Sequence, residues 1–318
     1  MLLRMMRVVS IALLVASAGL ASGQNYPYKP IRIVIPGTGG GGDIMARLIA
    51  NGLAGPLGQQ VVVENRPTGI IPAEIVSKAQ SDGYTLLLSG SGLWLAPFLY
   101  AKLPFDPVQD FSPITLAVRQ PNILVVHPSI ATTVAELIAV AKAKPGALNY
   151  ASGSTGAANH LAAELFKAMA GVNIVRINYK GAAAGLTAVM AGEVQVMFVT
   201  AASALPHVKT GRLRALAVTT AQPSALFPGL PTLAASGLPG YESSSVYGIF
   251  APAGTPRAII GRLNREIVAV LKGPEATRRL SGMGAEAVGS SPRQLAAFVK
   301  ADMAASGKLI RNAGIRPR

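Results

Sequence analysis

The segment IRIVIPGTGGGGD, residues 31–43, decides the fold of this chain. Residues 31–35 are mostly apolar and β-branched, which predicts a buried β-strand. A proline and a glycine-rich stretch follow at once, and apolar residues then recur at positions 44, 48, 49 and 53 with helical spacing. We therefore predict a strand, a glycine-rich loop and a helix with Asp43 as its N-cap, the first unit of a parallel α/β sheet.

The same alternation of strands and helices continues along the chain. Its first part has predicted strands at 31–35, 60–64 and 84–88, and a helix at 72–80. It restarts with strands at 123–127, 148–151, 175–179, 194–198 and 213–218 and helices at 133–144, 157–170 and 185–191. A short strand at 248–251 and helices at 256–272, 274–283 and 292–310 close the chain. This order predicts an α/β fold of two lobes with a ligand cleft between them.

Composition excludes several classes of protein. The 318 residues are 50% hydrophobic and only 14% charged, which excludes a disordered chain. The absence of Cys excludes disulfides, Cys-ligated metals, thiol catalysis and a lipidated N-terminal cysteine. The three His are far apart in the sequence, so we expect no metal and no cofactor. The net charge of +15 comes from scattered basic residues, which favours a solvated basic surface or attraction of a small acid over nucleic-acid binding.

The N-terminus has the pattern of a secretory signal peptide. Arg4 and Arg7 precede an uncharged apolar run at 8–18, and small residues at 21–23 follow it. The apolar run is shorter than the ~20 residues that a membrane span needs. We therefore expect residues 1–23 to be a signal peptide and the remaining chain to be periplasmic, without a lipid anchor.

Small polar residues and glycines gather where predicted strands end. The side chains are those of Thr38, Ser89, Ser91, Ser152, Ser154 and Thr155. Ligands of open α/β sheets bind outside the carboxyl ends of the strands, and N–H groups at helix N-termini attract anions. These loops predict a site for a small anion.

An enzymatic reading of the first loop is the alternative. Residues 37–42 fit the pattern GxGxxG, and Glu64 ends the next strand 22 residues after Gly42, as in dinucleotide-binding proteins. This would make the chain a secreted dinucleotide-dependent enzyme. Four consecutive glycines satisfy many patterns, however, no GxSxG motif occurs, and His160 is placed as a packing or capping residue at a helix start.

A series of short motifs carries a family resemblance. They lie at residues 28–36, 62–67, 82–87, 103–107, 110–114, 149–152, 160–162, 179–181, 205–207, 211–218 and 251–256. In these segments and in their order, the chain resembles the Bug (tripartite tricarboxylate transporter) extracytoplasmic solute-binding receptors. The resemblance spans nearly the whole chain after the signal peptide.

This resemblance implies a periplasmic binding protein-like α/β fold and no enzymatic activity. Lobe 1 would comprise residues 24–123 plus 246–318, with a helical C-terminal tail, and lobe 2 residues 124–245. The protein would be a monomer that captures a small organic acid and delivers it to the membrane permease subunits of a tripartite transporter. The ligand-binding residues would be Thr38, Gly39, Gly40, Ser89, Ser91, Ser152, Ser154, Thr155, Gly156, Tyr179, Gly181, Ala182 and Thr200.

The sequence also departs from the family pattern. The first loop is one residue shorter and lacks the usual aromatic residue and prolines, and Ile-Ile-Pro at 70–72 replaces small residues. Val199 and Ala188 stand where the family commonly has Asp. We expect a cleft that is less polar on one side, so a dicarboxylate, a monocarboxylate, an aromatic acid, a neutral amide and a loss of binding all remain open.

Overall fold

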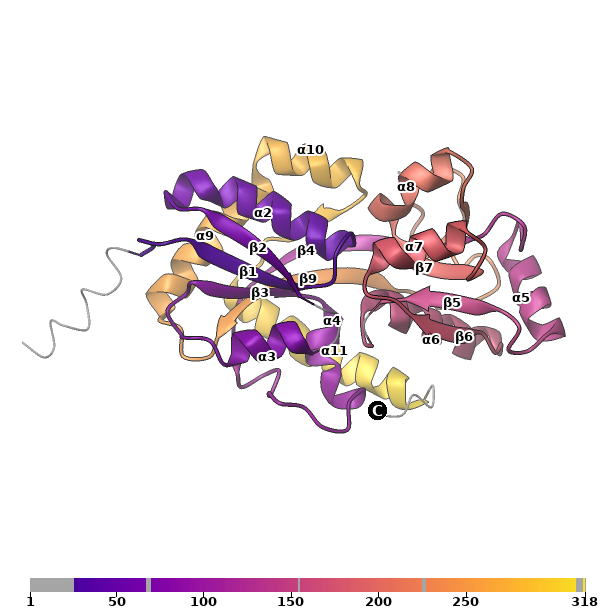
Figure 1. The fold of residues 1–318 in the computed structure, drawn as a ribbon, viewed down its shortest axis with the longest axis horizontal. Helices are drawn as coiled ribbons and strands as arrows, with labels where there is room; N and C mark the ends of the chain where they lie inside the picture. The colour runs from indigo at the N-terminus through magenta and orange to yellow at the C-terminus, as the bar shows by residue number, and fades with distance from the viewer. Residues whose placement is uncertain (1–25, 67–69, 154, 225–226, 313–316, 318) are drawn as a thin grey trace, which may run out of the picture.

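The computed structural model describes residues 26–66, 70–153, 155–224, 227–312 and 317. The expected signal peptide and Ser154 lie outside these residues. Two α/β halves lie side by side, and long strands run from one into the other (Figure 1). Within the described residues, no helix is long and apolar enough to cross a membrane.

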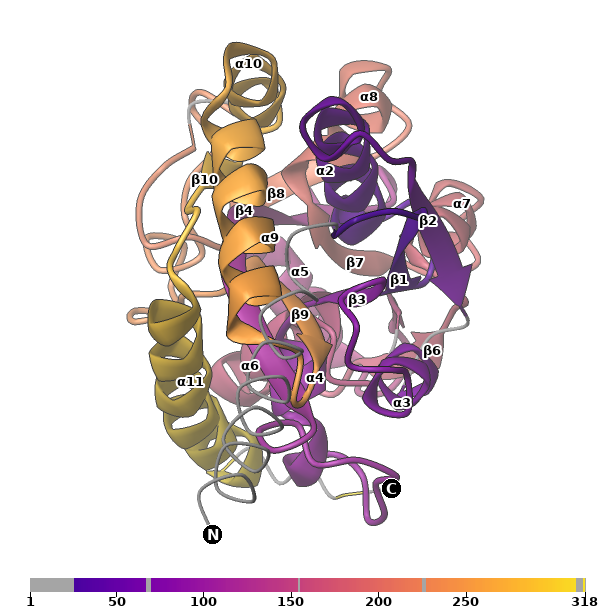
Figure 2. The ribbon, with the colours of Figure 1, turned by 90° about the vertical axis from the view of Figure 1, so that its left-hand side faces the viewer.

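The first half is built on three parallel strands, to which an antiparallel strand is added at one edge. β1 (Ile31–Pro36) lies between β2 (Val61–Arg66) and β3 (Thr85–Ser89), and β3 pairs with β9 (Ser244–Pro252). Alternate residues of β1 serve opposite faces, because side chains of a strand alternate. Ile33 and Ile35 pack in the core with α2 (Gly41–Leu57) and α9 (Arg257–Lys272), while Val34 packs with α3 (Ile71–Ser77), α4 (Ser91–Trp94) and α11 (Pro292–Asn312) (Figure 2).

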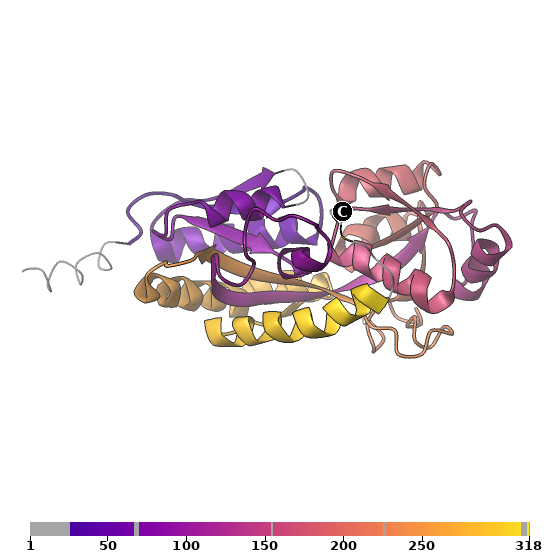
Figure 3. The same ribbon diagram turned by 90° about the horizontal axis from the view of Figure 1, so that it is seen from below.

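The short elements complete this half. They are η2 (Ala96–Phe98), α10 (Pro274–Gly282) and β10 (Glu286–Ala287). α11 runs lengthwise along the outside of the first half, where Figure 3 shows it as a long yellow helix. The helical tail therefore packs on the first half, as expected.

The second half repeats the layered arrangement. Its strands are β5 (Asn149–Ser152), β6 (Val175–Asn178), β7 (Val196–Thr200) and β8 (Arg214–Val218). One face is covered by α5 (Val134–Ala143) and α6 (Ala158–Ala170), the other by α7 (Ala182–Met190) and α8 (Ala201–Lys209). Each half thus buries its own two-sided core.

One strand joins the two halves. β4 (Phe111–Val126) pairs with β9 as far as Pro121↔Ser244 and with β7 from Asn122↔Thr200 onward. The sheet order is β2-β1-β3-β9-β4-β7-β5-β6, so β4 and β9 form the crossing between the lobes (Figure 1).

The structure corrects several local predictions. β4 begins 12 residues before the predicted strand at 123, because Pro113 and Pro121 interrupt the sequence pattern and register shifts in the pairing with β9 accommodate the chain. α8 was not predicted, and α7 begins at Ala182 instead of residue 185. The assignment of Asp43 as N-cap is wrong: Gly40 is the N-cap of α2, and the Asp43 carboxylate accepts a hydrogen bond from the Gly39 N–H at 3.0 Å.

Candidate functional site

A cavity of about 160 Å³ lies where the two lobes meet. Its walls come from the loops after β1, β3 and β5, from the starts of α2, α6, α7 and α8, and from the crossing strands. A cavity near this volume accommodates a molecule about the size of benzene. The cavity can therefore enclose a small organic ligand.

Four helices direct their N-termini at this cavity. The N-cap residues Gly40, Ala157, Gly181 and Thr200 all line it, and none of the four makes a side-chain cap hydrogen bond. The N–H groups of a first helical turn lack partners within the helix and carry the positive end of its dipole. The cavity is accordingly surrounded by uncapped positive helix ends.

The charged side chains around the cavity are few. Asp43 lines it, but its carboxylate is engaged by the Gly39 N–H, by Arg47 Nε at 2.9 Å and by Asn65 Nδ2 at 3.2 Å. Among the described residues that line the cavity, there is no Lys and no Arg. An anion bound here would be neutralised by backbone dipoles instead of a cationic side chain.

The two lobes touch at the rim of the cavity, so the structure is closed. A methyl group on Gly39 would lie 2.8 Å from Ala183 Cβ of the opposite lobe. One on Gly181 would lie 2.7 Å from the carbonyl oxygen of Thr38. On the other side of the cavity, Ser91 Oγ donates to the carbonyl oxygen of Gly156 at 3.4 Å. These contacts require small residues, since larger ones would hold the lobes apart.

An arginine of β6 organises the loop after β5. Arg176 donates to Ser152 Oγ at 2.6 Å, to Thr155 Oγ1 at 2.9 Å and to the Gly153 carbonyl at 2.9 Å. It also contacts Asn178 Oδ1 at 3.2 Å. Neither the composition nor the motifs indicated this residue; its position next to β5 depends on the parallel pairing of β5 with β6.

The Tyr100 hydroxyl lies next to the same network. Burial raises the pKa of Tyr100, while a hydrogen bond with Thr155 and the charge of Arg176 lower it. The Thr155 hydroxyl is therefore held by Arg176 at the edge of the cavity.

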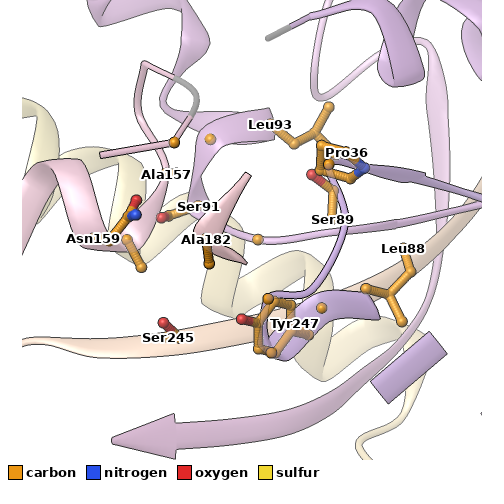
Figure 4. A pocket seen from close by; sticks show the side chains of 18 of the residues that line it. Pro36, Leu88, Ser89, Ser91, Leu93, Ala157, Asn159, Ala182, Ser245 and Tyr247 are labelled. Carbon is orange, nitrogen blue, oxygen red and sulfur yellow. The ribbon is translucent and has the colours of Figure 1, made fainter. Parts of the chain in front are cut away.

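The crossing strands form the floor of the cavity. Asn122 of β4 and Ser245 and Tyr247 of β9 line it, and the last two lie together beneath the loops (Figure 4). Burial raises the pKa of Tyr247 to about 12, against smaller lowering effects of hydrogen bonds with Ser245 and the Gly42 N–H. The hydroxyl thus stays protonated at neutral pH. Sequence reasoning missed all three residues, because strands paired across the hinge leave no local signal.

One wall of the cavity, on the first lobe, is apolar. Its side chains are those of Ile70, Pro72, Ala73, Leu93 and Phe105, and Val199 lines the cavity from β7 of the second lobe. Two of these, Ile70 and Pro72, belong to the segment that departs from the family pattern, and Val199 stands where Asp is common. The expectation of a less polar side agrees with this wall. Ala188 takes no part in it, since its side chain is buried in the core of the second lobe.

The predicted site residues separate into two groups. Those that line the cavity are Thr38, Gly40, Ser89, Ser91, Thr155, Gly181, Ala182 and Thr200. Four others do not line it: Gly39 and Gly156 form the contacts between the lobes, Ser152 is fully buried beneath Arg176, and Tyr179 packs against the core of the second lobe. The structure thus brings eight of the predicted residues together at one cavity, while Ser152 and Tyr179 contact other parts of the second lobe.

The two parts of the dinucleotide alternative are separated in the structure, because most of the loop 37–42 lines the cavity and Glu64 does not. Glu64 does not line the cavity and forms ion pairs with Arg32 and Arg66. The buried His160 accepts the Gly156 N–H at its Nδ1 at 3.1 Å, which agrees with a capping role.

Comparisons with known proteins agree with this architecture. The model of the tripartite tricarboxylate transporter family receptors matches residues 45–315. Protein BugT of Bordetella pertussis is 34% identical over 315 residues, which are 96% of this chain and 97% of BugT. The UPF0065 protein of the tcbD-tcbE intergenic region of Pseudomonas sp. strain P51 is 35% identical over 312 residues, which are 96% of this chain and 93% of that protein.

Solved structures show the same fold. An R. palustris protein solved with adipate has a TM-score of 0.89 and 37% identity, covering 92% of this chain and 100% of its own. The periplasmic binding protein BugD has a TM-score of 0.89 and 31% identity with the same coverage. MatC from Rhodopseudomonas palustris with bound malate has a TM-score of 0.85 and 26% identity, covering 90% of this chain and 100% of its own. The chain belongs to the Bug family of tripartite tricarboxylate transporter receptors, which are solute-binding proteins.

Proposed function

We propose that this protein captures a small carboxylate between its lobes. The observation that carries the proposal is the convergence of four uncapped helix N-termini on a closed cavity that no described Lys or Arg lines. Helix N-termini bind anions through backbone N–H groups and the helix dipole. Such a site selects a carboxylate by geometry and needs no cationic side chain.

The size of the ligand is bounded by the cavity. Its volume of about 160 Å³ is close to that of a cavity that holds a benzene-sized molecule, so we expect an acid of few carbons. Two solved relatives contain adipate and malate, acids of six and four carbons, and these set the range of acids to test. The apolar wall favours a ligand with a hydrocarbon segment over one that is polar throughout.

A thermal-shift screen of four- to six-carbon acids tests this function. A bound acid at 100 times its Kd should add about 2.7 kcal/mol to the free energy of unfolding. The neutral amides of the same acids serve as controls for the anionic group, and NAD and NADP serve as controls for the dinucleotide alternative. Stabilisation by a dinucleotide, with none by any acid, would contradict the proposal.

The proposal also covers where the protein works and which proteins receive its ligand. We infer that residues 1–23 direct export and that the mature protein, as a monomer with lobes 24–123 plus 246–318 and 124–245, delivers its ligand to membrane permease subunits. Membership in the transporter receptor family supports this inference.

Export has a direct test. N-terminal sequencing of protein from the periplasmic fraction should find a new terminus between about residues 18 and 24, in the zone of small residues that such signals use. Replacing Arg4 and Arg7 by Glu should reduce the exported fraction. An exported protein that still begins at Met1 would exclude a cleaved signal.

A further inference from the structure

Two side-chain amides lie on β4 where the strand passes between the lobes. Gln120 pairs with Ser245 of β9, and Asn122 pairs with Thr200 of β7. Residues two apart on a strand point to the same face. Both side chains are fully buried, and Asn122 lines the cavity. The amides therefore lie at the hinge and next to the ligand site.

These amides are unsatisfied in the closed structure. Within the described part of the chain, Asn122 Nδ2 and both polar atoms of the Gln120 side chain have no hydrogen-bond partner. Buried polar side chains of native proteins nearly always have partners, so each exception needs an explanation. A ligand in the adjoining cavity would supply the missing partner.

The surroundings fix what Asn122 can offer. Ser245 Oγ donates to Asn122 Oδ1 at 2.8 Å, which occupies the amide oxygen. The Nδ2 group remains as a hydrogen-bond donor of a residue that lines the cavity. The strand pair β4–β9 thus orients the amide so that it presents a donor.

Gln120 lies beneath the anion-binding end of α2. A methyl group on Gly41, the first residue of α2, would collide with Gln120 Oε1 and would lie 2.7 Å from the Tyr247 hydroxyl. This places the Gln120 amide next to the helix end and the floor of the cavity. Its unpaired Nε2 adds further donor capacity at the same place.

The donors have no cationic neighbour in the cavity wall. The helix N-termini compensate one carboxylate of the ligand, Asp43 already contributes a negative charge to the wall, and no described Lys or Arg lines the cavity to compensate a second ionised group. A neutral oxygen can accept from the amides without burying a second charge. We propose that Asn122 and Gln120 form a second recognition point, which takes an uncharged acceptor oxygen that the ligand carries in addition to its carboxylate.

The preferred ligand class follows from this arrangement. It consists of acids with a neutral carbonyl or amide oxygen in addition to the carboxylate, in preference to plain fatty acids and to dicarboxylates. A site built to bond a polar group rejects an analogue that lacks it, because the buried groups are then left unpaired. This inference rests on the proposed function, which supplies the carboxylate end.

Matched acids of one chain length test the second recognition point. Calorimetry at neutral pH compares the monoacid, its terminal monoamide and the dicarboxylate at four, five and six carbons, for example hexanoate, adipamate and adipate. We expect the monoamide to bind at least about fivefold more tightly than the monoacid at the best chain length, the gain from one or two hydrogen bonds. Replacing the amides by Asn122→Leu or Gln120→Met should bring the ratio of monoamide affinity to monoacid affinity, measured within each variant, down to about one.

A buried polar residue elsewhere on β4 gives the matched control. Thr115 is fully buried and donates to the Ser290 carbonyl at 2.8 Å, away from the cavity, so Thr115→Val should lower stability and preserve the gain. The two amide variants are separate tests, so a failure of one to fold leaves the other decisive.

The outcomes separate this inference from the proposed function. If no acid of the panel binds the wild-type protein, the proposed function is wrong and this inference falls with it. If acids bind but the gain persists in both amide variants, the second recognition point is wrong and the carboxylate site stands. Tighter binding of the dicarboxylate than of the monoamide would overturn the preference for a neutral oxygen.

Discussion

Gly39→Ala is expected to weaken binding of an acid found in the screen by about tenfold to a hundredfold, while Gly211→Ala leaves the affinity unchanged. Both glycines have φ +70°, so alanine meets the same backbone strain of about 1–2 kcal/mol at each position. Their surroundings differ. The new methyl group at position 39 would lie 2.8 Å from Ala183 Cβ of the other lobe, whereas at position 211 nothing lies within 4 Å.

The size of the effect follows from the closure of the lobes. Carbon atoms pack at about 3.5–4.0 Å, so the lobes must stop roughly an ångström short of the closed position. The helix N-termini then stand too far apart to bond one carboxylate together, and a hydrogen bond to a charged group contributes about 1.5–3 kcal/mol. Loss of one such hydrogen bond to the carboxylate corresponds to the expected tenfold to hundredfold loss of affinity, since about 1.4 kcal/mol is a factor of ten in Kd.

Calorimetric titration and urea unfolding of both variants check this prediction. The two variants should lose similar free energy of unfolding, and only Gly39→Ala should lose affinity. Equal affinity of Gly39→Ala and wild type would show that the contact between Gly39 and Ala183 does not limit closure. An equal loss in Gly211→Ala would assign the effect to backbone strain.

The second large effect is expected for Arg176→Met, which should raise the Kd of the same acid by about tenfold to a hundredfold. Arg176 holds two hydroxyls and a carbonyl of the loop 152–156. Its removal takes the charged hydrogen-bond donor away from the buried Ser152 Oγ and from Thr155 Oγ1. Each hydrogen bond to a charged group contributes about 1.5–3 kcal/mol, and this network is partly exposed. The loop that carries the start of α6 would then lose its fixed geometry.

Arg214→Met is the matched control. Arg214 is also half-buried and in the second lobe, and its Nη1 donates to the carbonyls of Pro128 at 2.8 Å and Ala131 at 3.2 Å. It does not line the cavity, so its replacement should lower stability and preserve affinity. Arg176→Lys should fall between wild type and Arg176→Met, because an ammonium group cannot reproduce the planar fork. Unchanged affinity of Arg176→Met would remove the arginine from the account of the site.

Local pattern determined the units of the fold. The run at 31–57 encodes a buried strand, a glycine loop and an amphipathic helix through residues that are neighbours in the chain, and the observed β1 and α2 follow it closely. The same holds for the strand-end loops, whose glycines and small polar residues line most of the cavity. The order of units, together with motifs spread over the whole chain, also indicated the family, which the comparisons confirm.

Only the tertiary structure decided which residues from distant parts of the chain contact each other around the cavity. Asn122 and Ser245 are 123 residues apart and meet because β4 and β9 pair antiparallel. Arg176 reaches Ser152 through the pairing of two neighbouring strands, and Gly181 meets Thr38 because the lobes close. Periodicity reports which face of an element is buried, but it contains no information on which distant element covers that face. The positive helix ends could therefore be expected from the sequence, whereas the amides, the arginine and the rim contacts that shape the cavity required the folded chain.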